Sequence, residues 1–545
     1  MAPLTVWVLA GCLLGVTSAQ STEDNVFWYR EAEGELEEAL NNEPNRNQAK
    51  NIIVFIGDGM GIPTITAARI YKGQQQGKNG EEGHLYFEKF PHVALSKTYN
   101  PDRQVPDSAG TATAYWCGYK GNYETLGVDA RVSAGQCTAS RVKRNSRPCL
   151  MEWAQEAGKD TGQSLWAVGG HCGHHCEHKR SAKTPSAHRN WECDEKLGER
   201  GRDCVDIARQ LVENAPGKLA KVIFGGGRQN MIANLNNTRF APENPSACKR
   251  QDGRDLTQDW LSEKRSAGLS AKFVATTEEL RSVNLSQTDH IMGLFGNSHT
   301  PYEDLRDKTL GGTPSLVEMT ETAIKLLSKN EKGFFLAVEG GRIDHAHHDT
   351  KARRSLSETL QFEEAVKRAH QLTSHQDTLI VVTADHSHVM TIQGYPVRGK
   401  DILGASEKSR DDGMPYTTLF YSNGPNWNVS WNGSHVVRGD LNGVDTTAWE
   451  YTQPSGLKFK EETHGGEDVA IYATGPWSHL FHGVHEQSYI PHVISHAARI
   501  GPRADCKALK SDQACAFSSA GPPTRLQAAP LALLLLLVSW MVRPH

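Results

Sequence analysis

Three stretches of this chain are patterned as strands buried on both faces, and each ends at an acidic residue. Continuous runs of branched and aromatic apolar residues lead to Asp58, Glu339 and Asp385. Such runs are typical of strands in a parallel sheet that helices cover on both sides, so they predict an α/β fold with a central, mostly parallel sheet flanked by helices. Ligands gather at the carboxyl ends of strands in these sheets. We therefore expect the three acids to converge on one site.

Histidines accompany two of these acids. Asp344 and His348 follow the Glu339 strand four residues apart, so on a helix they would share one face, and His386 follows Asp385 directly. Carboxylates and imidazoles are typical zinc ligands. A single Asp or His is more often structural, but three acid-tipped strands with histidines at two of them favour a metal centre. Asp58 is expected to bridge the ions.

Ser108 is the candidate nucleophile. The sequence around it predicts a turn that opens a helix, and both a helix N-terminus and a nearby zinc favour an ionised hydroxyl. Two zinc ions about 4 Å apart can activate a nucleophile on one side of phosphorus and stabilise the leaving oxygen on the other. The alternative is an ordinary helix-capping serine. Arg189 is the candidate phosphate clamp, because a guanidinium can bind two oxygens at once.

Both ends of the chain carry targeting patterns. Residues 1–19 resemble a signal peptide, although its first segment has no basic residue. Small residues, a polar spacer and a terminal apolar run predict a glycosylphosphatidylinositol (GPI) anchor, with the attachment residue at Ser518, Ser519 or Ala520 and a propeptide over 520–545. The alternative is a transmembrane tail. The expected location is the extracellular face of the plasma membrane, with the protein held in the outer leaflet by lipid.

The numbers of cysteines and glycosylation motifs agree with an extracellular location. Removing Cys12 with the signal peptide leaves ten of the 11 cysteines, an even number suited to disulfides. The acceptor pattern for N-glycosylation occurs at four positions, which are Asn236, Asn284, Asn428 and Asn432.

The net charge of −4, from 59 basic and 63 acidic residues, provides no basic stripe and argues against a nucleic-acid partner.

The chain shows no internal repeat or long linker, so a single catalytic domain over residues 20–519 is the simplest interpretation. Residues 394–462 lose the alternation of helix and strand patterns and become rich in Gly, Asn, Ser and Trp. They are expected to form a surface insertion.

Several motifs, in order along the chain, resemble those of the animal alkaline phosphatases of the GPI-anchored membrane type. These motifs occupy residues 57–61, 106–112, 339–348, 383–388 and 463–468, and the resemblance extends from about 27 to 506. The resemblance implies an alkaline phosphatase that hydrolyses phosphate monoesters to an alcohol and inorganic phosphate at alkaline pH through a phosphoserine intermediate. It also implies a homodimer, with the surface insertion as a crown over residues 394–462.

The resemblance further implies a role for each motif residue. Asp344, His348 and His464 would hold one zinc, while Asp58, Asp385 and His386 would hold the second. Asp58 and Glu339 would also hold magnesium. Substrate would contact Asp107, Ser108 and Arg189, and Ser108, besides being the nucleophile, would contact metal.

The chain departs from the family pattern over residues 167–188. Only Thr184, next to Pro185, resembles the turn that supplies the third magnesium ligand, and it lies too close to Arg189 in sequence. A local frameshift would explain the departure, whereas Cys172 and Cys176 raise the alternative of an extra zinc site. The acidic calcium ligands of animal members are also missing after residue 295, where glycines stand, so calcium binding is expected to be weak or absent.

Two further points rest on the resemblance. It implies a disulfide between Cys137 and Cys204. The family's C-terminal pair does not transfer, because Arg499 occupies one of its positions, and Cys515 could instead pair with Cys506. A phosphodiesterase or sulfatase of the same fold would use a threonine or a modified cysteine, which the Ser108 motif disfavours. A catalytically silent surface receptor is the alternative from another class, and the complete set of zinc ligands argues against it.

Overall fold

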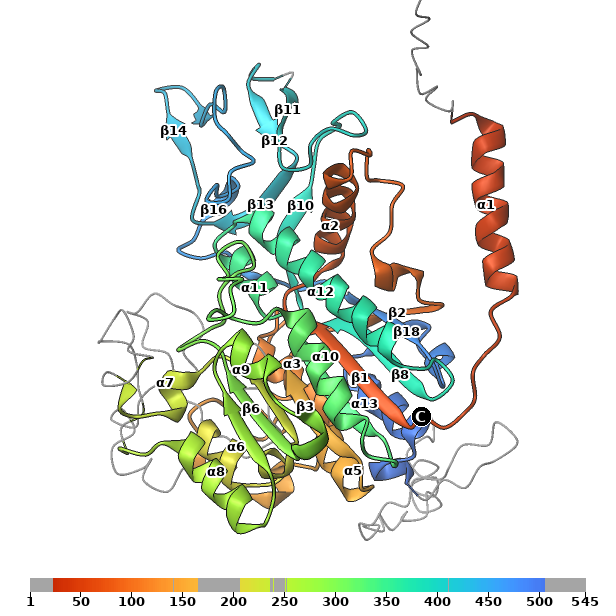
Figure 1. Ribbon diagram of the computed structural model, residues 1–545. Coiled ribbons are helices and arrows are strands. Elements are labelled where there is room, and N and C mark those ends of the chain that lie inside the picture. The colour runs from red at the N-terminus through yellow and green to blue at the C-terminus, as the bar shows by residue number, and fades with distance from the viewer. Residues whose placement is uncertain are drawn as a thin grey trace, which may run out of the picture.

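Figure 1 shows the computed structural model of the chain, which describes residues 23–140, 142–164, 206–235, 239, 250, 252–409 and 411–504. Ten strands of these residues form one large twisted sheet. Nine run parallel to one another and β18 runs antiparallel to both of its neighbours. In spatial order the strands are β19 (Gly483–Glu486), β2 (His92–Lys97), β18 (Val469–Thr474), β8 (Thr378–Ala384), β1 (Asn51–Gly57), β7 (Phe334–Glu339), β3 (Asp160–Ser164), β4 (Val222–Gly225), β6 (His290–Leu294) and β5 (Ala271–Val274). The predicted mostly parallel central sheet is confirmed.

Helices cover both faces of the sheet because its central strands bury side chains in both directions. Along β1, Ile52, Val54 and Ile56 belong to one core, whereas Ile53 and Phe55 belong to the other. This period of two follows from the strand geometry. The first core is covered by α3 (Ser108–Cys117), α5 (Leu150–Glu156), α6 (Ile207–Glu213), α8 (Leu256–Ser266) and α13 (Tyr489–Ala498). The second is covered by α2 (Ile62–Gln75), α10 (Leu316–Leu327) and α12 (Ala352–Leu372).

The three acid-tipped strands are neighbours at the centre of the sheet. Strand β1 lies between β8 and β7, and Ile56 is in register with Thr383 on one side and Glu339 on the other. Asp58 and Asp385 follow the last residues of β1 and β8, while Glu339 is the last residue of β7. Parallel pairing in this register brings all three acids to the same edge of the sheet. The predicted convergence at the carboxyl ends is confirmed.

Small sheets occupy much of residues 390–458, which we call the small-sheet region. Three strands, β10 (Met390–Ile392), β13 (Leu419–Gly424) and β16 (Ser455–Lys458), form its base, with β13 in the middle. Two hairpin-like pairs extend beyond them in Figure 1, namely β11 (Ala405–Lys408) with β12 (Pro415–Thr417) and β14 (Val429–Trp431) with β15 (Val436–Arg438). The base lies directly after the β8 strand end, next to the converging acids.

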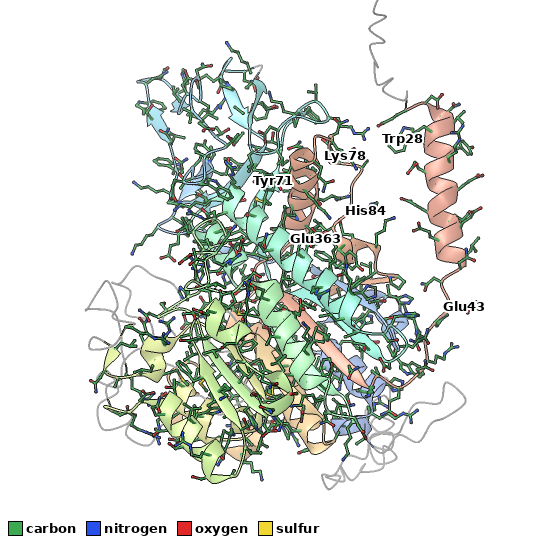
Figure 2. All side chains as sticks on the ribbon, in the orientation of Figure 1. Trp28, Glu43, Tyr71, Lys78, His84 and Glu363 are labelled. Carbon is green, nitrogen blue, oxygen red and sulfur yellow. A yellow bond between two sulfur atoms is a disulfide. The ribbon has the colours of Figure 1, made fainter. Side chains whose placement is uncertain are left out.

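The N-terminal helix α1 (Asn25–Leu40) lies apart from the layered body and buries none of its residues. Figure 2 labels Trp28 of this helix, which is half exposed, and also Glu363 of α12, which is buried in the layered body. Glu363 forms an ion pair with Lys72 of α2 and accepts a hydrogen bond from the backbone of Tyr86 at 2.6 Å. Such a contact joins α2 and α12 above the sheet.

A disulfide between Cys117 and Cys149 joins the end of α3 to the start of α5. Sequence spacing did not indicate this pair. Both cysteines are buried, and the bridge closes a loop with a sequence separation of 32. It fixes the helix that begins at Ser108 against its neighbour on the same face of the sheet.

The double substitution Cys117→Ala and Cys149→Ala is expected to lower the free energy of unfolding by about 3.5 kcal/mol. The reason is that the unfolded chain regains the loop entropy that the bridge removes. Denaturant unfolding of the two proteins measures the difference. Equal midpoints and slopes for the variant and the parent would contradict this role.

His290 opens strand β6 inside the core, 3% exposed, and its Nδ1–H donates to the backbone oxygen of Ala220 at 2.9 Å. Burial lowers its pKa from 6.5 to about 4. Between these two pH values the unfolded chain therefore binds more protons than the folded protein. The contribution of neutral His290 to stability is fully present above pH 6.5 and is lost as the pH falls toward 4.

The substitution His290→Asn keeps a donor for Ala220 but does not titrate. In this variant the melting temperature should fall less steeply between pH 6.5 and 4. At pH 4 the loss of unfolding free energy should be smaller than in the parent by up to about 3 kcal/mol. Thermal melts of both proteins across this range provide the comparison. An unchanged pH dependence in the variant would show that His290 is not the titrating group.

Candidate metal centre and active site

One cluster of possible metal ligands joins the ends of β1 and β8. Asp58, Asp385 and His386 are all buried, and their ligand atoms lie within 4.8 Å of one another. The Nε2 atom of His386 is 3.2 Å from Asp385 Oδ2 and 3.5 Å from Asp58 Oδ1. The backbone N–H of Gly59 donates to the other oxygen of Asp385 at 2.9 Å, which fixes that carboxylate. The set matches the residues expected for the second zinc.

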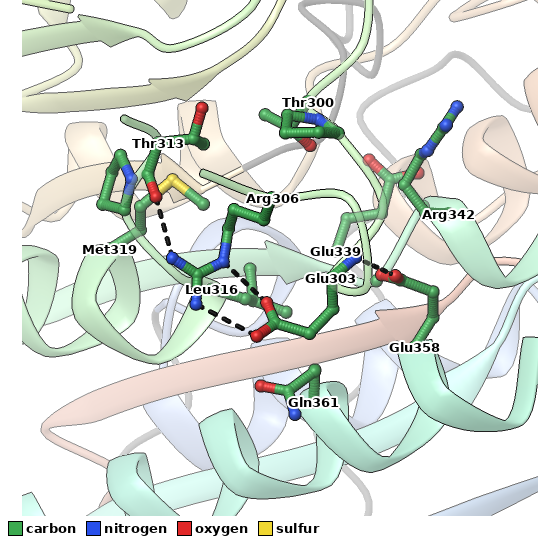
Figure 3. A pocket seen from close by; sticks show the side chains of 14 residues that line it. Thr300, Glu303, Arg306, Thr313, Leu316, Met319, Glu339, Arg342, Glu358 and Gln361 are labelled. Atoms are coloured by element: carbon green, nitrogen blue, oxygen red, sulfur yellow. Dashed lines mark hydrogen bonds and ion pairs between the residues drawn. The ribbon is translucent and has the colours of Figure 1, made fainter. Parts of the chain in front are cut away.

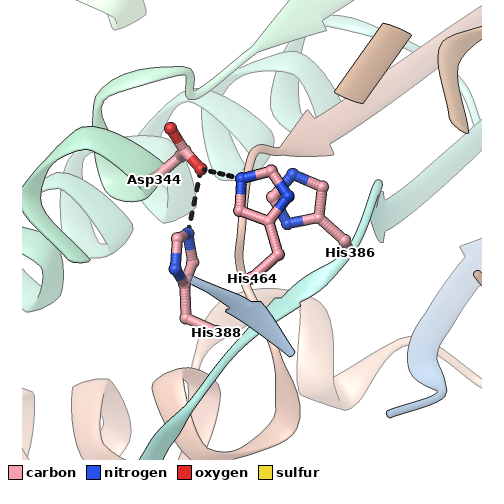
Figure 4. Close-up of side chains that lie close together, drawn as sticks. All are labelled: Asp344, His386, His388 and His464. Carbon is pink, nitrogen blue, oxygen red and sulfur yellow. Dashed lines mark hydrogen bonds and ion pairs between the residues drawn. The ribbon is translucent and has the colours of Figure 1, made fainter. Parts of the chain in front are cut away.

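A second cluster lies beside it on α11 (Arg342–His348) and strand β17 (His464–Gly465). Asp344 and His348 share a face of this short helix, as their spacing predicted. The Nε2 atoms of His348 and His464 are each 3.3 Å from Asp344 Oδ1 and 3.2 Å from each other. The rings of His464 and His386 stack at 3.5 Å between centroids, so the two clusters are contiguous. Figure 4 shows Asp344 facing His464, with His386 behind it.

Backbone carbonyls hold the ligand histidines in one orientation. The Nδ1 atom of His348 contacts the carbonyl of Glu462 at 2.5 Å, that of His464 the carbonyl of Pro106 at 2.9 Å, and that of His386 the carbonyl of Ser387 at 3.2 Å. A carbonyl can only accept, so each Nδ1 carries the proton and each Nε2 presents its lone pair to the site. Outer contacts of this kind are typical of metal-binding histidines.

Sequence reasoning assigned no role to His388 or Glu462, yet both belong to the site. His388 Nε2 is 2.9 Å from Asp344 Oδ1, and its Nδ1 is 2.5 Å from Glu462 Oε2. All three side chains are fully buried. A signal was present for His388, because a residue two positions after His386 in an extended segment faces the same side. For Glu462 the sequence offered no comparable signal, apart from its position two residues before His464.

The concentration of buried carboxylates raises their pKa values. Burial and the charges of Asp344, Asp385 and Glu339 raise the pKa of Asp58 well above its ordinary value. Burial, opposed by the backbone N–H of Gly59, raises that of Asp385 to about 7. Burial also lowers the pKa of His464 to about 4 and lowers that of His386, so both rings are neutral. Neutral imidazoles and carboxylates that need a positive neighbour are the donors that a divalent metal requires.

The residues fit zinc on these observations. Asp58 Oδ1 is buried and has no hydrogen-bond partner, which is costly unless a cation lies against it. Each cluster supplies carboxylate oxygen and imidazole nitrogen, both of which bind zinc in proteins. The donor sets therefore agree with the zinc assignment that the sequence motifs implied.

Ser108 is the first residue of α3 and lies next to the cluster formed by Asp58, Asp385 and His386. Its Oγ is 3.0 Å from Nε2 of His386. Asp107, not Ser108, caps the helix, because its carboxylate accepts from the N–H groups of Ala109 at 3.3 Å and Gly110 at 3.2 Å. The capping alternative for Ser108 is therefore wrong, and its hydroxyl is available at the positive end of the helix.

Glu339 also lines a cavity of about 50 Å³ beside the metal clusters, shown in Figure 3. Across this cavity Arg306 pairs with Glu303 at 2.7 Å and donates to the carbonyl of Thr313 at 2.9 Å. Burial raises the pKa of Glu358, another lining residue, to about 7. The cavity thus adds further half-buried carboxylates next to the site.

Several predicted residues lie outside the described ranges. These are Arg189, Thr184, the segment 167–188 that includes Cys172 and Cys176, Cys204, Asn236, both terminal segments and the cysteines at 506 and 515. Their predicted roles stay predictions.

Comparisons with known proteins agree with the fold and the motifs. The family model described as alkaline phosphatase matches residues 49–500. The chain is 43% identical to the tissue-nonspecific alkaline phosphatase of Gallus gallus over 525 residues, which cover 95% of this chain and 96% of the relative. It is 41% identical to the tissue-nonspecific isozyme of Homo sapiens, covering 92% and 94%, and 40% identical to the membrane-bound alkaline phosphatase of Bombyx mori, covering 90% and 88%.

Solved structures share the fold. The alkaline phosphatase of Thermus thermophilus superposes with a TM-score of 0.56 at 22% identity, covering 85% of this chain and 94% of that one. The alkaline phosphatase of the Antarctic bacterium TAB5 gives 0.52 at 20% identity, covering 84% and 99%. The fold and the buried Asp/His clusters define a metal-dependent hydrolase. The chain belongs to the alkaline phosphatase family and hydrolyses phosphate monoesters.

None of the helices in the described ranges combines the length and the apolar character that crossing a bilayer requires.

The substitution Asp58→Asn tests the electrostatics of the centre. In chelator-treated protein the raised pKa of Asp58 means that its charge opposes folding increasingly as the pH rises above 3.8. Asn removes that charge at similar size, so the metal-free variant should be more stable than metal-free parent by about 1–3 kcal/mol at pH 8.

The same variant should gain less melting temperature from added zinc, because it lacks one ligand. Melting curves of both proteins, with chelator and with zinc, give the four values needed. A metal-free variant less stable than its metal-free parent would contradict the argument.

Proposed function

We propose that this phosphatase acts through a phosphoserine at Ser108, in a site with two zinc ions and one magnesium ion per chain. The observation that carries the proposal is the 3.0 Å separation between Ser108 Oγ and Nε2 of His386, a ring nitrogen whose lone pair faces the proposed second metal. The expected ligands are Asp344, His348 and His464 for the first zinc and Asp58, Asp385 and His386 for the second. Bound zinc would supply positive charge that lowers the pKa of the serine hydroxyl and stabilises the leaving oxygen.

The chain's own residues prepare Ser108 for attack. Asp107 holds the first turn of α3 closed, so Ser108 keeps its place at the helix N-terminus, where the dipole favours an oxygen anion. Gly110 is needed there, because a Cβ at this position would lie 1.9 Å from Nδ2 of Asn100. Asn100 in turn accepts from the backbone N–H of Asp107 at 3.1 Å and donates to the carbonyl of Gly121 at 3.0 Å. The nucleophile is positioned by a rigid turn.

In the proposed reaction the Ser108 oxygen attacks the phosphorus of a small phosphomonoester, and the alcohol leaves. Arg189 binds two of the phosphate oxygens, and Asp107 belongs to the substrate-binding set. A water molecule then attacks the phosphoserine, which releases inorganic phosphate and restores the serine. The physical reason for alkaline activity is that a deprotonated nucleophile becomes more abundant as the pH rises.

Magnesium would be held by Asp58, Glu339 and a hydroxyl for which Thr184 is the candidate. Glu339 supports this assignment, because its charge acts on Asp58. Calcium is not part of the proposal. The carbonyl of Phe295, where the family pattern expects the calcium site, accepts a hydrogen bond from the hydroxyl of Thr313 at 3.3 Å.

We further propose the processed, surface-bound form that the sequence indicates. Residues 1–19 would be removed, 20–519 would form the catalytic domain with its crown over 394–462, and a GPI anchor would replace 520–545. The homodimer is supported by α1, whose Tyr29 and Leu40 are more than 70% exposed. Asn284, Asn428 and Asn432 are exposed and accessible to glycosylation.

The experiment is hydrolysis of p-nitrophenyl phosphate by protein truncated after residue 519, from pH 6 to 11. Ser108→Ala should lose at least about 10³-fold in kcat, since it removes the covalent route, while zinc content stays near that of the parent. Ser108→Cys is the matched control that restores a nucleophile of similar size. Full activity in Ser108→Ala, or a parent enzyme without an alkaline optimum, would overturn the proposal.

A further inference from the structure

The middle strand of the small-sheet region, β13, contacts both chain segments that carry the ligands of the first zinc. Tyr421 and Asn423 are two residues apart on this strand, so their side chains leave the same face. Tyr421 contacts α11, which carries Asp344 and His348. Asn423 contacts the segment that leads to His464.

Tyr421 acts through His347, a histidine of α11 that lies between the two ligand positions. Its hydroxyl is 2.8 Å from Nδ1 of His347, and the opposite ring nitrogen is 2.9 Å from the hydroxyl of Thr64 on α2. His347 and Tyr421 are completely buried, and the His347 ring stacks on His388 at 4.7 Å. A buried imidazole bonded at both nitrogens cannot turn, so it fixes the rotation of this seven-residue helix about its axis.

Asn423 holds the second segment with a pair of hydrogen bonds. Its Oδ1 accepts from the backbone N–H of Thr463 at 3.0 Å, and its Nδ2 donates to the hydroxyl of Thr463 at 2.9 Å. Thr463 lies between Glu462 and His464. The same contact therefore sets the position of a zinc ligand and of the residue whose carbonyl orients His348.

The ligands of the second zinc have a different support. Asp58 and Asp385 follow β1 and β8 of the large sheet, and the carbonyl of Asp385 accepts from the buried side chain of Gln487 at 2.8 Å. These contacts come from the central sheet and the segment before α13. The side chains that brace the two ligand sets thus come from different parts of the fold, although β17 also pairs with β9 (Ser387–His388), directly after His386.

We propose that Tyr421 and Asn423 are positioning residues for the first zinc, so that β13 of the small-sheet region sets the affinity of that ion alone. This inference rests on the zinc assignment in the proposed function. It adds that the two ions are held with separate stabilities. Loosening β13 releases the first zinc and leaves the second in place.

The test follows zinc release from the holoenzyme into a chromogenic chelator, with total zinc counted beforehand. The variants are Tyr421→Phe, which removes one oxygen, and Asn423→Leu, which removes both polar atoms at similar size. The phase that belongs to the first zinc is identified with His464→Ala, which removes one of its ligands. Matched controls are Tyr416→Phe and Asn426→Leu, from the same region, whose polar atoms contact Tyr395 and Thr452 instead.

We expect the first phase to become roughly 10- to 100-fold faster in both variants, the second phase to keep the parental rate, and the controls to match the parent. Circular dichroism at the assay temperature confirms that each variant is folded, and Tyr421→Phe keeps the core filled. Acceleration of both phases alike, or of neither, would overturn the inference. A parent that holds fewer than two zinc ions would instead show that the proposed function itself is wrong.

Discussion

The structure depends on negative charge that is buried at one edge of the sheet. Parallel pairing of β8, β1 and β7 places Asp385, Asp58 and Glu339 side by side, and α11 adds Asp344. Charges this close in a poorly solvated region repel one another strongly, as the raised pKa of Asp58 indicates. Divalent cations resolve the conflict. In the proposed function, bound cations would stabilise the site and would also supply the chemistry for the reaction.

The histidines show how the fold prepares for these cations. Each proposed zinc-binding ring donates a hydrogen bond from Nδ1–H to a backbone carbonyl, so all three Nε2 atoms face inward. The carbonyl of Pro106 is particularly informative, because it links His464 to the turn that presents Ser108. Movement of the turn that carries Ser108 would therefore directly displace His464, a proposed zinc ligand. The same turn thus sets the positions of both the attacking oxygen and His464.

The sequence predicted the sheet and most residues of the buried Asp/His clusters, because apolar runs and short spacings are local patterns. Apolar runs identified β1, β7 and β8, and the spacing of Asp344 and His348 identified one helical face. His347, Glu462 and the Cys117–Cys149 bridge were not predicted, because their roles depend on partners distant in sequence. His347 illustrates this: it stands beside a ligand in the motif, but Thr64 and Tyr421 determine where its ring points.

Anomalous diffraction from crystals of the purified protein, recorded on both sides of the zinc edge, tests most directly whether the buried carboxylates and the inward-facing histidines hold two separate zinc ions. We predict two peaks per chain, one bounded by Asp344, His348 and His464, the other by Asp58, Asp385 and His386. A single peak, or none in an active crystal, would contradict this prediction.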